Sequence, residues 1–135
     1  MKKFFAVAAL ILGIFVAQIS QTEAFYDPYE NDANFACAFT GHGGSMYLDL
    51  NSVDVQEYDP PHYQIAGRFV FQPSNNASVI ESYIEMHFNY RTKESSMRTN
   101  GGQWEYLGRV SPDGTFARGV ANALFRAAYR MNFYN

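Results

Sequence analysis

Two long stretches of alternating side chains, separated by a turn cluster, constrain the fold of this chain more than any other feature. Between His62 and Gln72, every second residue from Tyr63 onward is apolar or glycine. From Val79 to Tyr90, the same period of two places apolar residues on one face and mostly polar residues on the other. The intervening segment 73–78, PSNNAS, is typical of a turn. The pattern predicts an antiparallel hairpin that is wetted on one side.

A shorter stretch with the same period precedes this hairpin. Residues 46–50, MYLDL, alternate between aliphatic and other side chains, and a turn is expected at 51–52. Residues 53–55 resume the alternation, until the segment 59–61, DPP, interrupts the ladder because proline has no N–H to donate. One or two additional strands are therefore expected here.

Two glycine-rich segments mark further connections. Residues 35–39 are short and apolar, and the following GHGG at 41–44 breaks any regular element, so we expect a loop there. The segment 100–102, NGG, favours a tight hairpin because a positive φ angle is cheap at these residues. This hairpin would join strands at 95–99 and 103–107.

The C-terminal segment 116–135 loses the period of two and gains alanines, which predicts a helix. Six apolar residues of that helix would share one stripe and pack on the sheet. They are Phe116, Val120, Ala123, Leu124, Ala127 and Met131. Strands first and a helix last favour an α+β fold, an antiparallel β-sheet of about five strands covered by a C-terminal α-helix.

Residues 1–24, MKKFFAVAALILGIFVAQISQTEA, have the features of a secretory signal peptide. Lys2 and Lys3 precede an apolar run, and a small-residue pattern follows it, so we expect cleavage after Ala24. The alternative is a retained anchor helix, although the apolar run is shorter than the roughly 20 residues that span a bilayer. We therefore expect residues 25–135 to form a single secreted or periplasmic domain, with no stable membrane span after cleavage.

The composition and the few reactive residues exclude several functions. The net charge is −3, with no block of lysine and arginine to attract nucleic acid. The only thiol, Cys37, has apolar neighbours that favour burial, with an intermolecular disulfide as the alternative. The three histidines, His42, His62 and His87, lack the close spacing of zinc ligands, so we expect no metal and no cofactor.

The helix face opposite the core stripe carries the strongest candidate for a binding surface. Aromatic residues and arginine are the side chains that most often anchor interfaces. The candidates are Phe125, Arg126, Tyr129 and Arg130. The competing interpretation is that this face is buried, either under the N-terminal segment at 25–29 or against a second copy of the chain.

An enzymatic alternative would use a histidine with a carboxylate. His42 or His87 would have to meet Asp49 or Asp59 within hydrogen-bond distance, as in a small hydrolase or cell-wall enzyme. The acidic residues between 49 and 59 are otherwise typical of a solvated strand edge. Because no acid, base, nucleophile or metal set converges in the sequence, we assign no catalytic residue.

Three segments carry a resemblance to known proteins: MYLDLNSVDVQEYDPPHYQIAG, FNYRTKESSMRTNGGQWEYL and ALFRAAYRMNFYN. They are similar to an uncharacterised group of small exported bacterial proteins and, more distantly, the order of elements resembles the surface-adhesin protein E type of domain. The resemblance implies an extracytoplasmic antiparallel sheet with helical cover and, in the adhesin, attachment to host matrix proteins. It implies no catalytic residues, and this chain lacks a lipid-anchor signal.

Together these observations predict a secreted or periplasmic, non-catalytic binding or envelope-associated domain. Its expected partner is a protein or a component of the cell envelope. A homodimer, formed through the helix face or an exposed strand edge, is the structural alternative.

Overall fold

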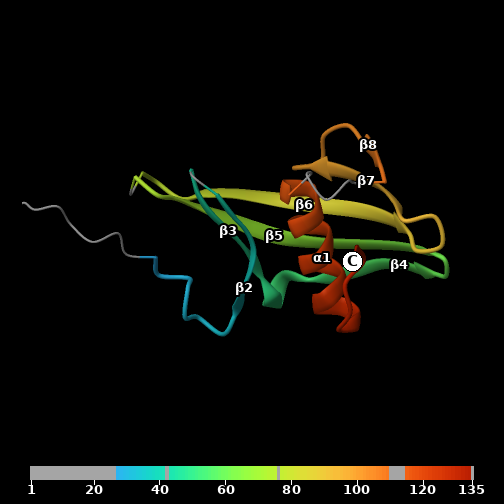
Figure 1. The fold of residues 1–135 in the computed structure, drawn as a ribbon, viewed down its shortest axis with the longest axis horizontal. Helices are drawn as coiled ribbons and strands as arrows, with labels where there is room; N and C mark the ends of the chain where they lie inside the picture. Colours follow the sequence, from blue (N-terminus) through green and yellow to red (C-terminus); the bar gives the residue numbers. More distant parts are fainter. Residues whose placement is uncertain (1–26, 42, 76, 110–114, 135) are drawn as a thin grey trace, which may run out of the picture.

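The computed structural model describes residues 27–41, 43–75, 77–109 and 115–134. They form one antiparallel sheet of seven strands, with a single helix crossing one face (Figure 1). The strands are β2 (Phe35–Gly41), β3 (Gly44–Asp49), β4 (Asp54–Asp59), β5 (His62–Pro73), β6 (Ile80–Asn89), β7 (Glu94–Thr99) and β8 (Glu105–Gly108). The helix is α1 (Thr115–Tyr129), and the 3₁₀ turn η2 (Leu50–Ser52) separates β3 from β4. The predicted α+β class is confirmed, with seven strands rather than about five.

The predicted central hairpin is confirmed as the pair β5–β6. It runs antiparallel over ten residue pairs, from Phe71 opposite Ile80 to His62 opposite Asn89. The second predicted hairpin is present, but its loop is longer than the tight turn expected: β7 pairs with β8 from Met97 opposite Glu105 to Ser95 opposite Gly108, and β8 begins at Glu105 rather than at residue 103. Asn100 and Gly101 in this loop have φ angles of 53° and 72°, in the left-handed region. The order across the sheet is β2-β3-β5-β6-β7-β8.

Strands β3 and β4 both pair with the same edge of β5, one after the other. The turn η2 interrupts this edge, as the turn expected at residues 51–52 indicated. The Ser52 hydroxyl bridges the interruption: it donates to the Asp49 carbonyl and accepts from the Arg68 backbone N–H, both at 2.7 Å. The side chain therefore supplies the hydrogen bond that a continuous strand would have made.

Strand β2 is the main element that the sequence pattern did not predict. Both ends of the expected loop are strand residues: β2 pairs with β3 from Phe35 opposite Asp49 to Gly41 opposite Gly44. A register shift between Cys37 and Phe39 interrupts the alternation that would have identified the strand.

Two glycines let the helix approach the sheet closely. A Cβ atom on Gly119 would lie 2.0 Å from the Ala38 carbonyl oxygen of β2. A Cβ atom on Gly67 of β5 would lie 2.7 Å from Leu48 Cδ1 and 3.1 Å from Leu124 Cδ2. The helix thus rests on the β2–β3–β5 end of the sheet, over a core rich in aromatic residues.

The helix ends earlier than predicted, and its buried face is different. Arg130 has a φ angle of 62°, which terminates α1, and the chain then folds back. The Asn122 side chain holds this return by accepting from the backbone N–H groups of Phe133 and Tyr134 at 2.8 and 2.7 Å. Met131 is consequently exposed rather than part of the core stripe.

Of the other predicted stripe residues, Val120, Ala123 and Leu124 are buried, whereas Phe116 and Ala127 are exposed. The buried face of α1 extends instead to the side of the helix that was expected to face away from the sheet. Among the described residues, no helix has the length and apolarity needed to cross a membrane.

Candidate functional site

The structure separates the four residues predicted to form a binding surface. Phe125 is only 2% exposed, so the prediction that it lies on a face opposite the core is wrong. Its ring packs against Tyr63, Phe88 and Phe133, at centroid distances of 5.2 to 5.4 Å. The buried face of α1 is turned toward Phe125, compared with the predicted face, and the C-terminal segment folds back over it. Both features put this ring in the core.

Within the described residues, the cover over Phe125 comes from the sheet and the C-terminal segment. Residues 25 and 26 of the predicted N-terminal cover lie outside the described residues. Tyr29 packs elsewhere, against Phe35 and Tyr47, at centroid distances of 4.8 and 5.6 Å.

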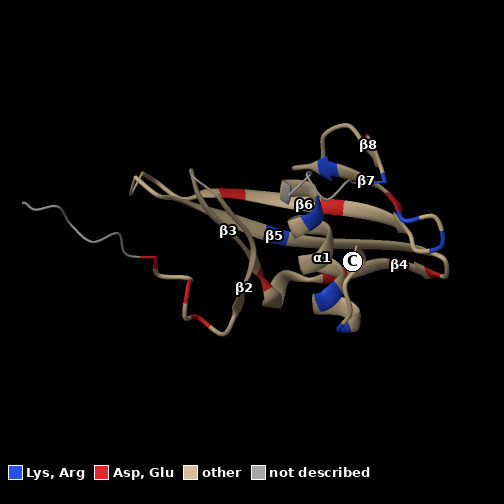
Figure 2. Cartoon of the chain, in the orientation of Figure 1, with Lys and Arg blue, Asp and Glu red and all other residues tan. Residues whose placement is uncertain are grey.

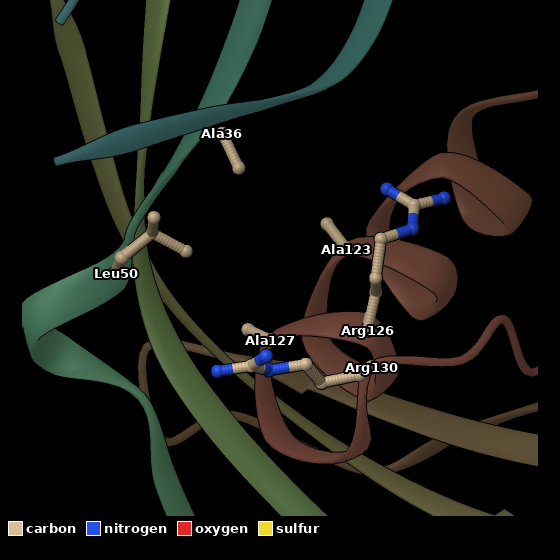
Figure 3. A pocket seen from close by; sticks show the side chains of 6 residues that line it. All are labelled: Ala36, Leu50, Ala123, Arg126, Ala127 and Arg130. Atoms are coloured by element: carbon tan, nitrogen blue, oxygen red, sulfur yellow. The ribbon is translucent and has the colours of Figure 1, made fainter. Parts of the chain in front are cut away.

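Arg126 and Arg130 remain exposed and line a groove between α1 and the β2–η2 region (Figure 3). The groove has a volume of about 350 Å³. Its other walls are apolar: Ala36, Leu50, Ala123 and Ala127. In Figure 3, the Arg130 guanidinium group extends from the end of the helix toward Leu50. The site thus combines an apolar surface with two positive charges.

The Arg126 side chain is held in place at the end of the helix. Arg126 donates from Nε and Nη2 to the Asn132 side-chain oxygen, at 2.9 and 2.6 Å, and it lies in the last turn of α1. A cation there also offsets the partial negative charge of the helix end. Within the described residues, neither Arg126 nor Arg130 forms an ion pair with a carboxylate.

The charge pattern around the groove favours an anion. The α1 sequence, TFARGVANALFRAAY, contains no acidic residue, although the chain as a whole is acidic. Figure 2 shows the basic residues spaced along the helix. A guanidinium group can bind a carboxylate or phosphate through two parallel N–H···O bonds. Chemically, the groove can therefore hold an anionic head beside an apolar body.

The histidines predicted for an enzymatic site behave differently from one another. His42 lies outside the described residues. His87 lies on the polar face of β6, as predicted, and its Nε2 atom is 3.5 Å from Glu57 Oε1 of β4. Its partner is thus neither Asp49, which pairs with Arg68 at 2.9 Å, nor Asp59, which stands opposite His62 in register.

A hollow of about 200 Å³ lies beside His87 on the face of the sheet away from α1. The rings of His62 and His87 are 5.4 Å apart at their centroids. The lining comprises His62, His87, Asn89, Glu94, Ser95, Ser96 and Tyr106. Sequence spacing did not reveal the contact between His87 and Glu57, because it requires β4 and β6 to flank the same segment of β5.

The rest of this open face is held by ion pairs. Glu85 of β6 binds Arg98 of β7, with Nη2 at 3.3 Å from Oε2 and Nε in closer contact. This hydrogen bonding holds the pKa of the buried Glu85 carboxyl below its ordinary value. Arg68 bridges Asp49 and Glu81, at 2.9 and 3.2 Å. These pairs tie adjacent strands together across the wetted side of the sheet.

Cys37 is exposed, so its predicted burial is wrong. It lies on edge strand β2 opposite Tyr47, and its Sγ atom is 3.3 Å from the Thr40 hydroxyl. Its neighbour Ala38 packs against the core, while the thiol alternates to the other face, where it lines a hollow with Asp27 and Tyr47. The intermolecular disulfide stays a prediction.

In the described part of the chain, no group of three or more histidine, cysteine, aspartate or glutamate residues is arranged to hold a metal ion. No protein-family description, curated protein or solved structure matches the chain. The fold and the grooves on its surface are thus the basis for inferring a function.

Proposed function

We propose that this protein is an exported, non-catalytic binding domain whose α1 groove takes an anionic amphiphile, such as a fatty-acid-type molecule. The observation that carries the proposal is the position of Arg126 and Arg130 beside an apolar groove, without a carboxylate partner in the described part of the chain. Charged groups at an apolar surface fix the orientation of a ligand, while the apolar walls supply most of the contact area.

The size of the groove supports a small ligand or part of a larger one. Its volume of about 350 Å³ lies near the lower end of ordinary ligand sites, which begin at roughly 300 Å³. An acyl chain of medium length would lie along Ala36, Leu50 and Ala123, with its carboxylate or phosphate at Arg130. Molecules of this type are components of a cell envelope.

Export is part of the proposal and rests on the signal-like segment at residues 1–24. Sequencing the N-terminus of the protein purified from culture medium or from a periplasmic extract tests it directly. A chain that begins at Phe25 is the expected result. A chain that begins at Met1 in the cytosol would contradict it.

Binding is tested by titrating the purified protein with decanoate and with decanol by calorimetry. The two probes share their alkyl chain, so the difference in affinity reports the carboxylate alone. We expect decanoate to bind at least tenfold more tightly. Replacing Arg130 with Gln should weaken decanoate binding roughly tenfold, the value of one charge-assisted hydrogen-bond pair, and leave decanol unaffected.

Two further variants serve as controls for this titration. Leu50→Glu places a negative charge in the groove and should abolish decanoate binding. Arg91→Gln removes an exposed arginine from the β6–β7 turn, outside the groove lining, and should change nothing. Equal affinity for the two probes, or an equal effect of the Arg91 and Arg130 substitutions, would contradict the proposed site.

A protein partner is the other form of binding that the sequence predicts. The proposal of a homodimer through the helix face or through the exposed edge strand β4 is tested by light scattering of the purified protein. A dimer mass supports it, and a strictly monomeric mass at high concentration contradicts it.

One observation favours hydrolysis as a second candidate function: the contact of 3.5 Å between His87 and Glu57, beside a hollow of about 200 Å³. In hydrolases that use a histidine as general base, a carboxylate beside the imidazole orients the ring toward the water molecule. Release of soluble fragments from purified peptidoglycan, lost on His87→Gln, would support this candidate. No release, or release that His87→Gln leaves unchanged, would contradict it.

A further inference from the structure

A third hollow, distinct from the two already described, is walled almost entirely by aromatic rings. It has a volume of about 320 Å³ and lies where the end of α1 meets β4, β5 and the end of β6. Four of the six lining residues are tyrosines. The lining consists of Tyr58, Tyr63, Tyr90, Phe125, Tyr129 and Met131.

Three of the tyrosines form a triangle. The ring centroids of Tyr58 and Tyr63 are 5.6 Å apart, those of Tyr63 and Tyr129 5.2 Å, and those of Tyr58 and Tyr129 6.1 Å. A cation placed over such a triangle lies within about 6 Å of all three centroids, the range of cation–π attraction. Phe125, which is buried in the core, lines the bottom of the hollow.

The rings carry no competing charge at neutral pH. Burial raises the pKa of Tyr63 and of Tyr129 above the ordinary value for a phenol, and neighbouring tyrosines act in the same direction. Each neutral ring presents a negative face. The same aromatic cluster already holds a cation at its far end, where Lys93 Nζ lies 3.3 Å from the Tyr90 centroid.

One polar atom in the cluster lacks a partner. The Tyr129 hydroxyl is buried and makes no hydrogen bond within the described structure. Buried hydroxyl groups are nearly always paired, so an unpaired one calls for an explanation. Tyr58, which is 67% exposed, forms the outer wall. A small outward movement of this ring would open the hydroxyl to an oxygen atom of a ligand.

We infer that this pocket, named here the tyrosine pocket, binds a quaternary ammonium group of the choline type. The methylated nitrogen sits over the triangle of Tyr58, Tyr63 and Tyr129, and the Tyr129 hydroxyl donates to the ligand oxygen two carbons away. A fully methylated nitrogen has no N–H that needs a hydrogen-bond acceptor, whereas a primary ammonium group has three. A pocket made of ring surfaces therefore suits the methylated group better.

The test is a titration of the purified protein with choline, tetramethylammonium and 3,3-dimethylbutan-1-ol, followed by NMR of the aromatic protons. The last compound has the shape of choline without its charge. We expect saturable binding of both cations and at least tenfold weaker binding of the neutral compound. Equal binding of choline and the neutral compound, or no saturable binding of either cation, would overturn the inference.

Substitutions locate the binding. Tyr58→Ala should weaken choline binding at least fivefold, whereas Tyr58→Phe keeps the ring and should retain it. Tyr106→Ala is the matched control, because Tyr106 is 68% exposed but lies on the other face of the sheet. An equal loss in the Tyr58→Ala and Tyr106→Ala proteins would overturn the assignment to this pocket.

A further variant tests the role assigned to the orphan hydroxyl. Tyr129→Phe should weaken the binding of choline but not that of tetramethylammonium, which has no oxygen. Parallel circular dichroism spectra show whether each variant is folded. If Tyr129→Phe binds both cations as the parent does, the hydrogen bond to the ligand oxygen is wrong.

Discussion

The Ser52 hydroxyl accepts a hydrogen bond of 2.7 Å from the backbone N–H of Arg68, sixteen residues further along the chain. This contact fills the interruption between β3 and β4 and keeps both strands on one edge of β5. It also places Leu50 of η2 beside the helix, where it forms one wall of the groove. The geometry of the proposed binding site therefore depends on a hydrogen bond within the sheet.

Replacing Ser52 with Ala should lower the free energy of unfolding by about 1 to 3 kcal/mol, because the Arg68 N–H loses its partner at a half-buried position. Chemical denaturation measures this change. Ser78→Ala, in the exposed turn before β6, is the control and should have little effect. An unchanged unfolding midpoint for the Ser52 variant would show that water replaces the hydroxyl without cost.

Phe125 should be essential for folding rather than for binding. Phe125→Ala is expected to cost about 3 to 5 kcal/mol of stability, as for other fully buried aromatic residues. Phe116→Ala, on the same helix but 39% exposed, should cost clearly less. Thermal unfolding of the two variants gives the comparison. Equal losses would mean that Phe125 is not the core residue of this helix.

The Glu85–Arg98 pair should make stability depend on acid. Because the pKa of Glu85 is lowered in the folded protein, chiefly by the hydrogen bond from Arg98, the pair stabilises the fold at neutral pH. That contribution is complete above the unfolded pKa of about 4.3 and is lost as the pH falls through the lower, folded value. The difference in unfolding free energy between the parent and Glu85→Gln should therefore shrink below about pH 4. A difference that stays constant from pH 7 to pH 2 would contradict this account.

Cys37 should react with a thiol reagent in the native state, because it is exposed on edge strand β2. Complete modification by Ellman's reagent without denaturant is the expected outcome, at a rate close to that of the unfolded protein. Reaction only after addition of guanidinium chloride would show that the thiol is covered in solution. No reaction even in guanidinium chloride would indicate a disulfide, and mass spectrometry without reductant would then show whether it links two chains.

Much of the sheet was predictable because its information is local. The alternation in β5 and β6 and the turn residues between them specify the hairpin without reference to the rest of the chain. The NGG segment likewise marks the reversal between β7 and β8, although the pairing itself starts only at Met97 and Glu105. Strand β2 was missed because a register shift interrupts its alternation and glycines follow it directly.

The site was less predictable because it depends on contacts between distant segments. Periodicity alone assigned Phe125 to the outer face, whereas the close approach at Gly119 and the left-handed Arg130 rotate the helix and end it early. The groove beside Arg126 and Arg130 exists only because η2 lies opposite the helix. The tyrosine pocket likewise gathers residues from four separate segments, and only the contact between Phe125 and Tyr129, four residues apart on α1, follows from local spacing.

The account depends most on the α1 groove as a site for an anionic amphiphile. The most direct measurement is NMR of the methyl groups of Ala36, Leu50, Ala123 and Ala127 during a titration with decanoate. The account predicts saturable shifts of these methyl signals, with one common affinity, and their loss in the Arg130→Gln protein. Unchanged methyl signals in the groove, at decanoate concentrations that shift signals elsewhere, would contradict it.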